Sequence, residues 1–343
     1  MVYTFELIKH SNIRYREGAV SLSRCELLAM LRALSLDCEV SVETLGGAVF
    51  LSFDCRELSP GELRYLSSHS SVSFMAVKES GSLLRPLSSG YVPYLPEDLP
   101  EILKYKGKTS VPFTRMMINT AAALTPYVFR EEPLSFFDPV CGKGTGCFCA
   151  LLLGMNVTGM DQDAKALREA SAFFSRYLQY HKLKHEKRDH SVTSGKRSVP
   201  VTSFAFSDSR EHFQAGDQRH LSLAAADTSL SPVLFRRRPV HLIVADLPYG
   251  IQHAPRDGGK PESLRGFLDR VLPVWKSLMA PGAALALSFN TLTLPSSAVR
   301  EALGRAGLRP LETDPYLTLK HEVEQAVVRD VVFACNNEEE LKS

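Results

Sequence analysis

The stretch from Val244 to Gly250, VADLPYG, places an acid, a proline and an aromatic ring directly after an apolar run. The run at 241–245 is typical of a buried strand in a parallel sheet, and Pro248 ends the extended pairing. Asp246 and Tyr249 are therefore predicted at the carboxyl edge of a strand. Open α/β sheets bind their ligands at this edge, so the stretch is a candidate reactive site.

A planar exocyclic amine fits this turn chemically. The Asp246 carboxylate and the Leu247 carbonyl can accept both hydrogens of an NH2 group, while Tyr249 offers a ring on which a base can stack. The alternative interpretation is an ordinary strand-to-loop turn, because short motifs recur by chance and need the right structural context. That context has to come from the rest of the chain.

A second candidate element lies upstream of this turn. Residues 134–137 are typical of a strand, residues 138–146 read DPVCGKGTG, and residues 147–153 have an apolar helical pattern. The three glycines let the backbone approach a ligand closely, and Asp138 can accept hydrogen bonds from a cationic group. A strand, a glycine loop and a helix in this order are typical of nucleotide-binding turns.

A third element follows at Asn156 to Asp161, NVTGMD. Its apolar pattern predicts another strand, and Asp161 at its end lies roughly 20 residues past the glycine loop, where a ribose-binding acid belongs. The glycine loop and this acid support each other as parts of one cofactor site.

The motifs DPVCGKGTG, GMDQD and ADLPYG, in that order, resemble those of class I S-adenosylmethionine-dependent methyltransferases. The combination of DPxCGxGT with DxPYG resembles the THUMP-associated tRNA guanosine-N2-methyltransferase family, and the similarity covers roughly residues 108–333. The resemblance implies an α/β fold with a Rossmann-like sheet, S-adenosylmethionine as the cofactor, tRNA as the partner, and the exocyclic N2 amine of a guanosine as the methyl acceptor.

The same resemblance assigns roles to individual residues. It places the methionine end of the cofactor on the glycine loop, the ribose on the second acid, and the target amine on the DPPY-type turn. Leu247 departs from the family, which has a proline there, but it keeps the carbonyl that the chemistry uses. The residues assigned to the cofactor are Phe113, Thr114, Asp138, Pro139, Cys141, Gly142, Gly144, Thr145, Asp161, Gln162 and Asp227, and those assigned to the amine are Asp246, Leu247, Pro248 and Tyr249.

Two of these assignments have alternatives within the sequence. The acid that binds adenine is either Asp227, which follows a strand pattern at 221–226, or Asp208, which follows an equally good pattern at 201–206. We favour Asp227, because its spacing to Asp246 leaves room for one connection and the next strand. For Phe113 and Thr114, which precede the glycine loop, a plain helix start is the alternative to cofactor contact.

Composition sets the outer bounds. The chain has 343 residues, 44% hydrophobic and 23% charged, which is long enough for two globular domains. It has no run of about 18 apolar residues and no basic-then-apolar signal segment, so we expect a cytoplasmic protein without membrane attachment. Its 7 cysteines include no CxxC pair, which indicates reduced thiols and no zinc site. The net charge of +2 does not by itself indicate a nucleic-acid partner.

The order of elements predicts two domains. Residues 1–95 alternate strand and helix patterns like a small α/β, ferredoxin-like domain, and residues 96–343 form the Rossmann-like methyltransferase domain. Related enzymes place a ferredoxin-like piece and a THUMP module here; residues 1–95 do not have room for both, so we expect a reduced version of this THUMP-associated region. Residues 1–98 hold nine Lys and Arg against twelve Asp and Glu, which argues against a strong RNA contact and leaves a scaffold or dimerisation role open. Prolines between about residues 80 and 108 predict a linker without regular elements.

The stretch from Arg176 to Arg197 is the most polar of the chain, with seven Lys and Arg against two acids. A solvated charged loop is the usual explanation for such an insertion. The alternative is that it adjoins the catalytic face and binds RNA phosphates. Its three histidines lack a metal-ligand spacing, so we expect no metal. The candidate phosphate contacts are Lys182, Lys184, Lys187 and Arg188.

Other protein classes share parts of this pattern. A DNA adenine or cytosine amino-methyltransferase would have both motifs, but it usually brings a separate DNA-reading segment. A protein-glutamine methyltransferase would use a similar turn on a planar amide. A non-enzymatic cofactor-binding scaffold would be expected to have lost Asp246 or the glycine loop, and both are intact. An RNA guanosine-N2-methyltransferase accounts best for DxPYG following DPxCGxGT.

Overall fold

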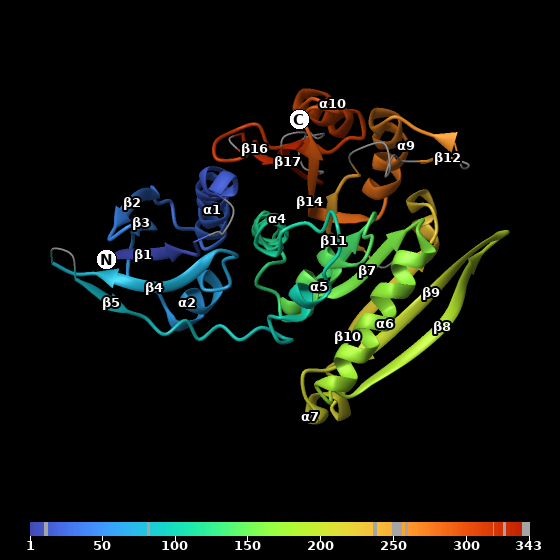
Figure 1. Ribbon diagram of the computed structural model, residues 1–343, viewed down its shortest axis with the longest axis horizontal. Coiled ribbons are helices and arrows are strands. Elements are labelled where there is room, and N and C mark those ends of the chain that lie inside the picture. The colour runs from blue at the N-terminus through green and yellow to red at the C-terminus, as the bar shows by residue number, and fades with distance from the viewer. Residues whose placement is uncertain are drawn as a thin grey trace.

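The structure is a computed structural model that describes residues 1–9, 13–80, 83–235, 239–248, 256–257, 260–317, 319–324 and 327–337. Most strands belong to one of two sheets, a five-stranded sheet from the first part of the chain and a ten-stranded sheet from the remainder (Figure 1). This arrangement confirms the predicted α/β fold with a Rossmann-like sheet and a smaller N-terminal sheet.

The first sheet has the strand order β2-β3-β1-β4-β5, and every pairing in it is antiparallel. Its first four strands and two helices follow one another as βαββαβ, which is the expected ferredoxin-like order. The elements are β1 (Val2–Leu7), α1 (Ile13–Ala33), β2 (Ser41–Leu45), β3 (Ala48–Asp54), α2 (Pro60–Leu66), β4 (Val72–Lys78) and β5 (Leu84–Pro86).

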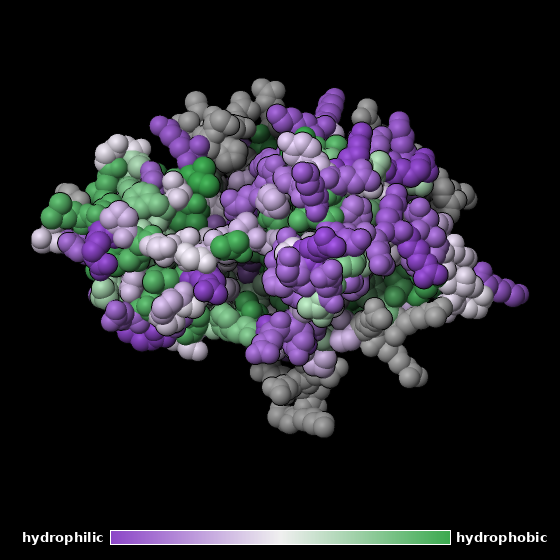
Figure 2. All heavy atoms as spheres, turned by 90° about the horizontal axis from the view of Figure 1, so that it is seen from below, coloured by the Kyte–Doolittle hydropathy of each residue, from purple (hydrophilic) through white to green (hydrophobic). Residues whose placement is uncertain are grey.

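Local sequence explains the main elements of this module. Tyr3, Phe5 and Leu7 occupy alternate positions of β1 and are buried together with leucines of α1. Helix α2 begins with a capping box, in which the Ser59 hydroxyl accepts from the Glu62 N–H at 3.3 Å and the Glu62 carboxylate accepts from the Ser59 N–H at 2.8 Å. Seen from below, apolar side chains gather over this module, and hydrophilic ones cover most of the remaining surface (Figure 2).

The linker contains two short regular elements. The prediction of no regular structure between residues 80 and 108 is wrong for β5, which pairs with β4, and for the single turn α3 (Leu99–Ile102). The Tyr94 N–H donates to the Leu152 carbonyl at 2.8 Å, and Leu95 is buried in the core of the larger sheet. The chain therefore packs against α5 and the core of the larger sheet before α3 begins.

The larger sheet has the order β15-β17-β14-β11-β6-β7-β10-β9-β8, with β16 paired to β17. The five strands from β14 to β10 are mutually parallel, whereas β17 runs antiparallel to β14. Its strands are β6 (Ser135–Asp138), β7 (Asn156–Asp161), β8 (His185–Ser194), β9 (Arg197–Phe206), β10 (Arg219–Ala225), β11 (Val240–Asp246), β14 (Met279–Asn290), β15 (Arg309–Pro310), β16 (His321–Glu324) and β17 (Val327–Cys335).

Helices cover both faces of this sheet (Figure 1). In β6, Phe136 is buried in the core that contains α4, α5 and α6, while Phe137 is buried in the core that contains α9 and α10. Burial on both faces explains the near-continuous apolar runs of the central strands. The helices are α4 (Val111–Ala123), α5 (Thr145–Leu152), α6 (Ala164–Tyr180), α7 (Arg210–Gln214), α8 (Pro232–Phe235), α9 (Leu264–Lys276) and α10 (Ser296–Arg305); a 3-10 turn η1 (Thr228–Leu230) and the strand pair β12 (Arg256–Asp257) and β13 (Lys260–Pro261) complete the described elements.

The basic insertion is mostly a β-hairpin. Strands β8 and β9 extend the sheet beyond β10 by two antiparallel strands, so the solvated-loop prediction is wrong for residues 185–194. In β9, Phe204 and Phe206 are buried towards α6, while Val199 and Val201 are buried on the other face. The loop prediction failed because β8 has few apolar residues of its own and relies on β9 for its buried contacts.

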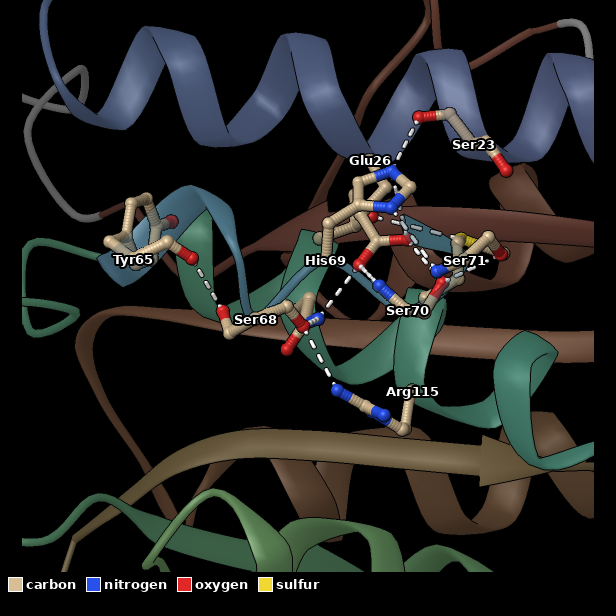
Figure 3. Close-up of polar contacts among 11 residues, drawn as sticks. Ser23, Glu26, Tyr65, Ser68, His69, Ser70, Ser71 and Arg115 are labelled. Atoms are coloured by element: carbon tan, nitrogen blue, oxygen red, sulfur yellow. Dashed lines mark hydrogen bonds and ion pairs between the residues drawn. The ribbon is translucent and has the colours of Figure 1, made fainter. Parts of the chain in front are cut away.

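A buried polar cluster joins the first module to helix α4 (Figure 3). The Glu26 side chain is fully buried and accepts from Asn119 Nδ2 at 2.7 Å and from the Ser70 N–H at 2.7 Å. Asn119 and Arg115 of α4 also donate to the Ser68 carbonyl, at 2.9 Å and 3.1 Å. Because a buried carboxylate needs hydrogen-bond donors, this cluster fixes α4 against α1.

All seven cysteines are free thiols. Among the described residues, no helix is long and apolar enough to cross a membrane. In the same part of the chain, no group of three or more His, Cys, Asp and Glu side chains is arranged to hold a metal ion.

Candidate active site

A pocket of about 690 Å³ opens at the carboxyl edge of the parallel strands. Residues at the ends of β6, β7 and β11, the start of α5 and the first turns of α4 line it, together with the segment at 105–109. This is the crevice in which open α/β sheets bind ligands, and its size is typical of a small-molecule site.

The glycine loop forms one wall of the pocket. Gly142 and Gly144 have φ angles of 51° and 86°, in the left-handed region that glycine adopts readily. The Gly142 N–H donates to Asp161 Oδ2 at 2.8 Å, which ties the loop to the end of β7. A Cβ at Gly146 would lie 2.5 Å from Asp138 Oδ2, so glycine is required where α5 passes this carboxylate.

Asp138 is the most perturbed acid of the pocket. Burial is the main cause that raises the pKa of its carboxyl to about 8, and the nearby charges of Asp161 and Asp246 act in the same direction. The Val140 N–H, which donates to Asp138 Oδ1 at 3.2 Å, opposes this shift. A cationic ligand group would offset the cost of ionising Asp138 here, so the pocket favours a positively charged ligand.

Asp161 ends β7 as predicted and lines the pocket. Its Oδ2 accepts from Gly142 and its Oδ1 accepts from the Asp163 N–H at 2.9 Å. Burial raises the pKa of its carboxyl, and these backbone hydrogen bonds counteract the rise. Each oxygen keeps acceptor capacity for a further donor, as a pair of ribose hydroxyls would supply.

Of the two adenine candidates, Asp227 lies nearer the site. Its chain neighbours on both sides line the pocket, although Asp227 itself does not. Asp227 Oδ1 pairs with Arg270 Nη1 at 2.9 Å, and its Oδ2 accepts from the Gln162 amide. Asp208 follows β9, which runs antiparallel to β10, so it lies at the opposite edge of the sheet, bonded to His212 at 2.6 Å.

Asp246 ends β11, and three side chains hold its carboxylate. The Ser288 hydroxyl donates to Oδ1 at 2.7 Å, and the Thr109 hydroxyl donates to Oδ2. Arg329 Nη2 lies 3.6 Å from the same Oδ2. The Asp246 side chain is 22% exposed and lines the pocket, so a fixed carboxylate with remaining lone pairs faces the cavity.

The turn after Asp246 continues along the pocket. The Leu247 N–H donates to the Ser288 carbonyl at 2.8 Å, while Leu247 and Pro248 both line the cavity. Tyr249 lies outside the described residues, and its stacking role stays a prediction.

Arg329 is a site residue that the sequence reasoning missed. It comes from β17, is 2% exposed, and its guanidinium carbon lies 4.9 Å from the centre of the Phe113 ring. A buried arginine needs an anionic partner, and Asp246 provides one. The signal was present in VVRDVVF, an apolar strand pattern interrupted by charge.

Most of the predicted cofactor and amine residues line this one pocket. Phe113 does not, because it lies a third of a helical turn from Thr114 and packs under Arg329. Gly144 does not line the pocket either. It is the N-cap of α5, and a Cβ at this position would lie 3.3 Å from the Phe148 ring. The predicted residues in the lining are Thr114, Asp138, Pro139, Cys141, Gly142, Thr145, Asp161, Gln162, Asp246, Leu247 and Pro248.

The four basic candidates of the insertion are placed differently from the expectation. Lys182 and Lys184 precede β8, which begins level with the start of β10, at the amino edge of the sheet. They therefore do not adjoin the pocket, which lies at the carboxyl edge. Lys187 Nζ lies 5.7 Å from the Phe204 ring centre, and Arg188 is exposed. Contact between these residues and RNA stays a prediction.

No family model and no curated protein matches the chain. Among solved structures, the chain is similar to TrmN from Thermus thermophilus, with 18% identity, a TM-score of 0.42 and 87% of this chain covered; it spans 60% of the length of that structure. The T. thermophilus 16S rRNA N2 G1207 methyltransferase RsmC, in complex with AdoMet and guanosine, has 12% identity and a TM-score of 0.37, with 87% and 58% covered.

A further similar structure is the magnesium protoporphyrin IX methyltransferase ChlM from Synechocystis with bound SAM, at 14% identity and a TM-score of 0.40, with 70% of this chain and 90% of ChlM covered. Each of these three similarities has a TM-score below 0.5, so the fold is assigned from the strand order of the larger sheet alone.

Proposed function

We propose that the chain is an S-adenosylmethionine-dependent RNA methyltransferase that modifies the exocyclic N2 amine of a guanosine in tRNA. The observation that supports this most is the Asp246 carboxylate, fixed by Ser288 and Arg329 at one side of a pocket whose other side is a glycine loop with a buried acid. The pocket thus combines an amine acceptor with groups that suit a cationic cofactor.

The pocket residues fit S-adenosylmethionine. Asp138, whose pKa is raised to about 8, would be stabilised as a carboxylate by the ammonium group at the methionine end. Gly146 leaves room beside Asp138, and Asp161 has acceptors for ribose hydroxyls. When bound, the cofactor supplies an electrophilic methyl group.

The residues around Asp246 would prepare the acceptor amine. The lone pair of a guanine N2 amine is delocalised into the ring, so the amine must be held in line and its developing positive charge offset. In our proposal, Asp246 and the Leu247 carbonyl accept the two N–H groups. Ser288 and Arg329 keep the carboxylate oriented, so the stabilising charge is already in place when transfer occurs.

The substrate base has to leave its stack to reach this pocket, which favours a single-stranded or loop region of tRNA. Tyr249 is proposed to stack on the base. We also propose that residues 1–95 form a ferredoxin-like domain that supports α4 through Glu26, and that residues 96–343 form the methyltransferase domain. With its free thiols, the protein is proposed to act in the cytoplasm.

The decisive experiment is methyl transfer from labelled S-adenosylmethionine to in vitro transcribed, unmodified tRNA, followed by mass spectrometry of the nucleosides. We expect N2-methylguanosine with the wild type and strongly reduced product with Asp246→Asn. Methylated adenine or cytosine in DNA, or methylated protein glutamine, would assign one of the other enzyme classes. Cofactor binding without transfer to any RNA would contradict the proposal.

A further inference from the structure

Residues 104–109, KYKGKT, form a strap across the mouth of the pocket, and two hydroxyl contacts attach it there. The Tyr105 hydroxyl lies 2.7 Å from Thr145 Oγ1, at the start of α5 on the glycine-loop side. At the other end of the strap, the Thr109 hydroxyl donates to Asp246. The strap therefore bridges the glycine loop and the proposed amine site.

Between these two attachments the strap forms a tight turn. The Lys108 N–H donates to the Tyr105 carbonyl at 3.3 Å, and Gly107 has a φ of 79° at the third position of this turn. Lys106 and Gly107 form its tip, and both are exposed while still contributing to the pocket lining. The turn thus holds the Lys106 backbone at the pocket mouth.

The lysines around the strap divide into two groups. Lys108 Nζ donates to the Pro100 carbonyl at 2.5 Å, and Lys143 pairs with Glu169 at 2.6 Å. By contrast, Lys104 and Lys106 are exposed and form no ion pair within the described part of the chain. Lys106, which lines the pocket, therefore offers an ammonium group to an external anion at the mouth, and Lys104, which precedes the pocket-lining Tyr105, offers a second one on the same strap.

Neither the N-terminal module nor the first two lysines of the insertion supply net positive charge at the pocket. The N-terminal module is net acidic, and Lys182 and Lys184 of the insertion lie at the opposite edge of the sheet. A nucleotide whose base enters the pocket leaves its backbone phosphates at the mouth, and lysine contacts phosphate as a compact point charge.

We infer that the strap is a phosphate-binding surface that holds the RNA backbone beside the target nucleotide through Lys104 and Lys106. This inference rests on the proposed function, because it requires a nucleic-acid substrate at this pocket. It assigns to the linker a role that composition alone would give to the basic insertion.

The test compares the wild type with the double variant Lys104→Ala/Lys106→Ala. Binding of a short single-stranded RNA oligonucleotide is measured over a salt series by fluorescence anisotropy. Two lost phosphate contacts should make the slope of log K against log salt shallower by about 1.4 and weaken binding by about 25-fold at about 0.1 M salt. The KM for tRNA should rise, while kcat at saturating tRNA and the affinity for S-adenosylmethionine stay within about twofold.

Two further variants make the comparison specific. Lys104→Arg/Lys106→Arg keeps both charges and should keep the wild-type slope. As the control, Lys276→Ala/Arg309→Ala removes two positive charges at the amino edge of the sheet. Lys276 ends α9, and Arg309 of β15 lies opposite Cys335 of β17 in the strand register. This variant should leave the salt slope unchanged. Thermal melts check that all variants fold.

The outcomes separate this inference from the proposed function. If the wild type methylates tRNA but the alanine strap variant keeps its salt slope and KM, the strap inference is overturned and the proposed function stands. An equal change in the Lys276/Arg309 control would show a general charge effect and would also overturn the inference. If the wild type binds the cofactor but methylates no RNA, both fail.

Discussion

The guanidinium of Arg329 lies 3.6 Å from the carboxylate of Asp246, although the two residues come from β17 and β11, which β14 separates. The Arg329 side chain is only 3% exposed, so its charge is largely withdrawn from water. Ser288 stands directly opposite Asp246 in the neighbouring strand and binds the other carboxylate oxygen. These partners fix both the position and the electrostatic surroundings of the acid that the proposed chemistry uses.

Removing the charge of Arg329 should weaken the ability of Asp246 to stabilise the acceptor amine, while every proposed substrate contact is kept. In Arg329→Gln we expect single-turnover methyl transfer to fall about a hundredfold, as for the loss of one preorganised electrostatic partner. Because both residues then act as one unit, the double variant Arg329→Gln/Asp246→Asn should be little slower than Asp246→Asn alone. Independent, multiplying losses in this cycle would show that Arg329 does not act through Asp246.

Asp246→Asn separates binding from catalysis. The amide keeps the shape and one acceptor oxygen but removes the charge that offsets the amine's developing positive charge, so turnover should fall about a hundredfold or more. Affinity for S-adenosylmethionine, measured by calorimetry, should barely change. A wild-type rate of single-turnover transfer to unmodified tRNA would make this acid structural, and the proposed amine site would have to be abandoned.

Asp161→Ala should weaken cofactor binding, because it removes the acceptors for the ribose hydroxyls and the contact that holds the glycine loop. The wild type is expected to bind one S-adenosylmethionine per chain, and the loss of hydrogen bonds to a charged acceptor should cost about 1.5–3 kcal/mol of binding free energy. Asp208→Ala is the matched control, since Asp208 lies at the opposite edge of the sheet. An equal loss in both variants, or no calorimetric binding by the wild type, would rule out this cofactor site.

The raised pKa of Asp138 predicts a pH dependence of cofactor binding. Burial shifts the pKa from 3.8 to about 8, so the free protein carries a neutral carboxyl at neutral pH. A cationic ligand favours the carboxylate, so binding should release about one proton near pH 7 and tighten as pH rises from about 6 towards 8. Calorimetry in buffers of different ionisation enthalpy measures this proton, and Asp138→Asn should abolish it.

The same shift affects folding with a definite sign. Between pH 3.8 and about 8 the folded Asp138 holds a proton that the unfolded chain has lost, so its contribution to the free energy of unfolding falls as pH rises through this window. Asp138→Asn should flatten this part of the stability profile, measured by denaturant unfolding of the protein without ligand. A profile unchanged by the substitution would refute the burial effect.

The sequence revealed the parts of the site whose signals are local. Asp138, Asp161 and Asp246 each end an apolar run, and parallel strands bring such ends to one edge, so their convergence could be predicted from periodicity alone. The glycine loop is equally local, because its φ angles and its contact with Asp138 arise within nine residues.

The remaining site residues depend on contacts between distant segments. Thr109 lies 137 residues before Asp246, and Arg329 lies two strands away from it. The charge within VVRDVVF marks Arg329 as unusual, but no local pattern identifies Asp246 as the partner of either residue. Strand β9 was predicted from its pattern at 201–206, but its partner β8 was missed for a related reason, since the apolar residues that bury the hairpin lie on β9. Pairing across strands, and not composition, decided its structure.

The basic insertion yields the last prediction. If Lys182, Lys184, Lys187 and Arg188 contact phosphates, changing all four to Ala should weaken tRNA binding and make its salt slope shallower by about 0.7 per lost single-strand contact, while cofactor affinity stays the same. Since Lys182 and Lys184 lie at the amino edge of the sheet, only an RNA that extends from the pocket across β10 and β9 can reach them. The quadruple variant should therefore lose affinity for full-length tRNA but keep its affinity for a short oligonucleotide. An unchanged slope with full-length tRNA would show that these side chains are a solvated surface of the hairpin.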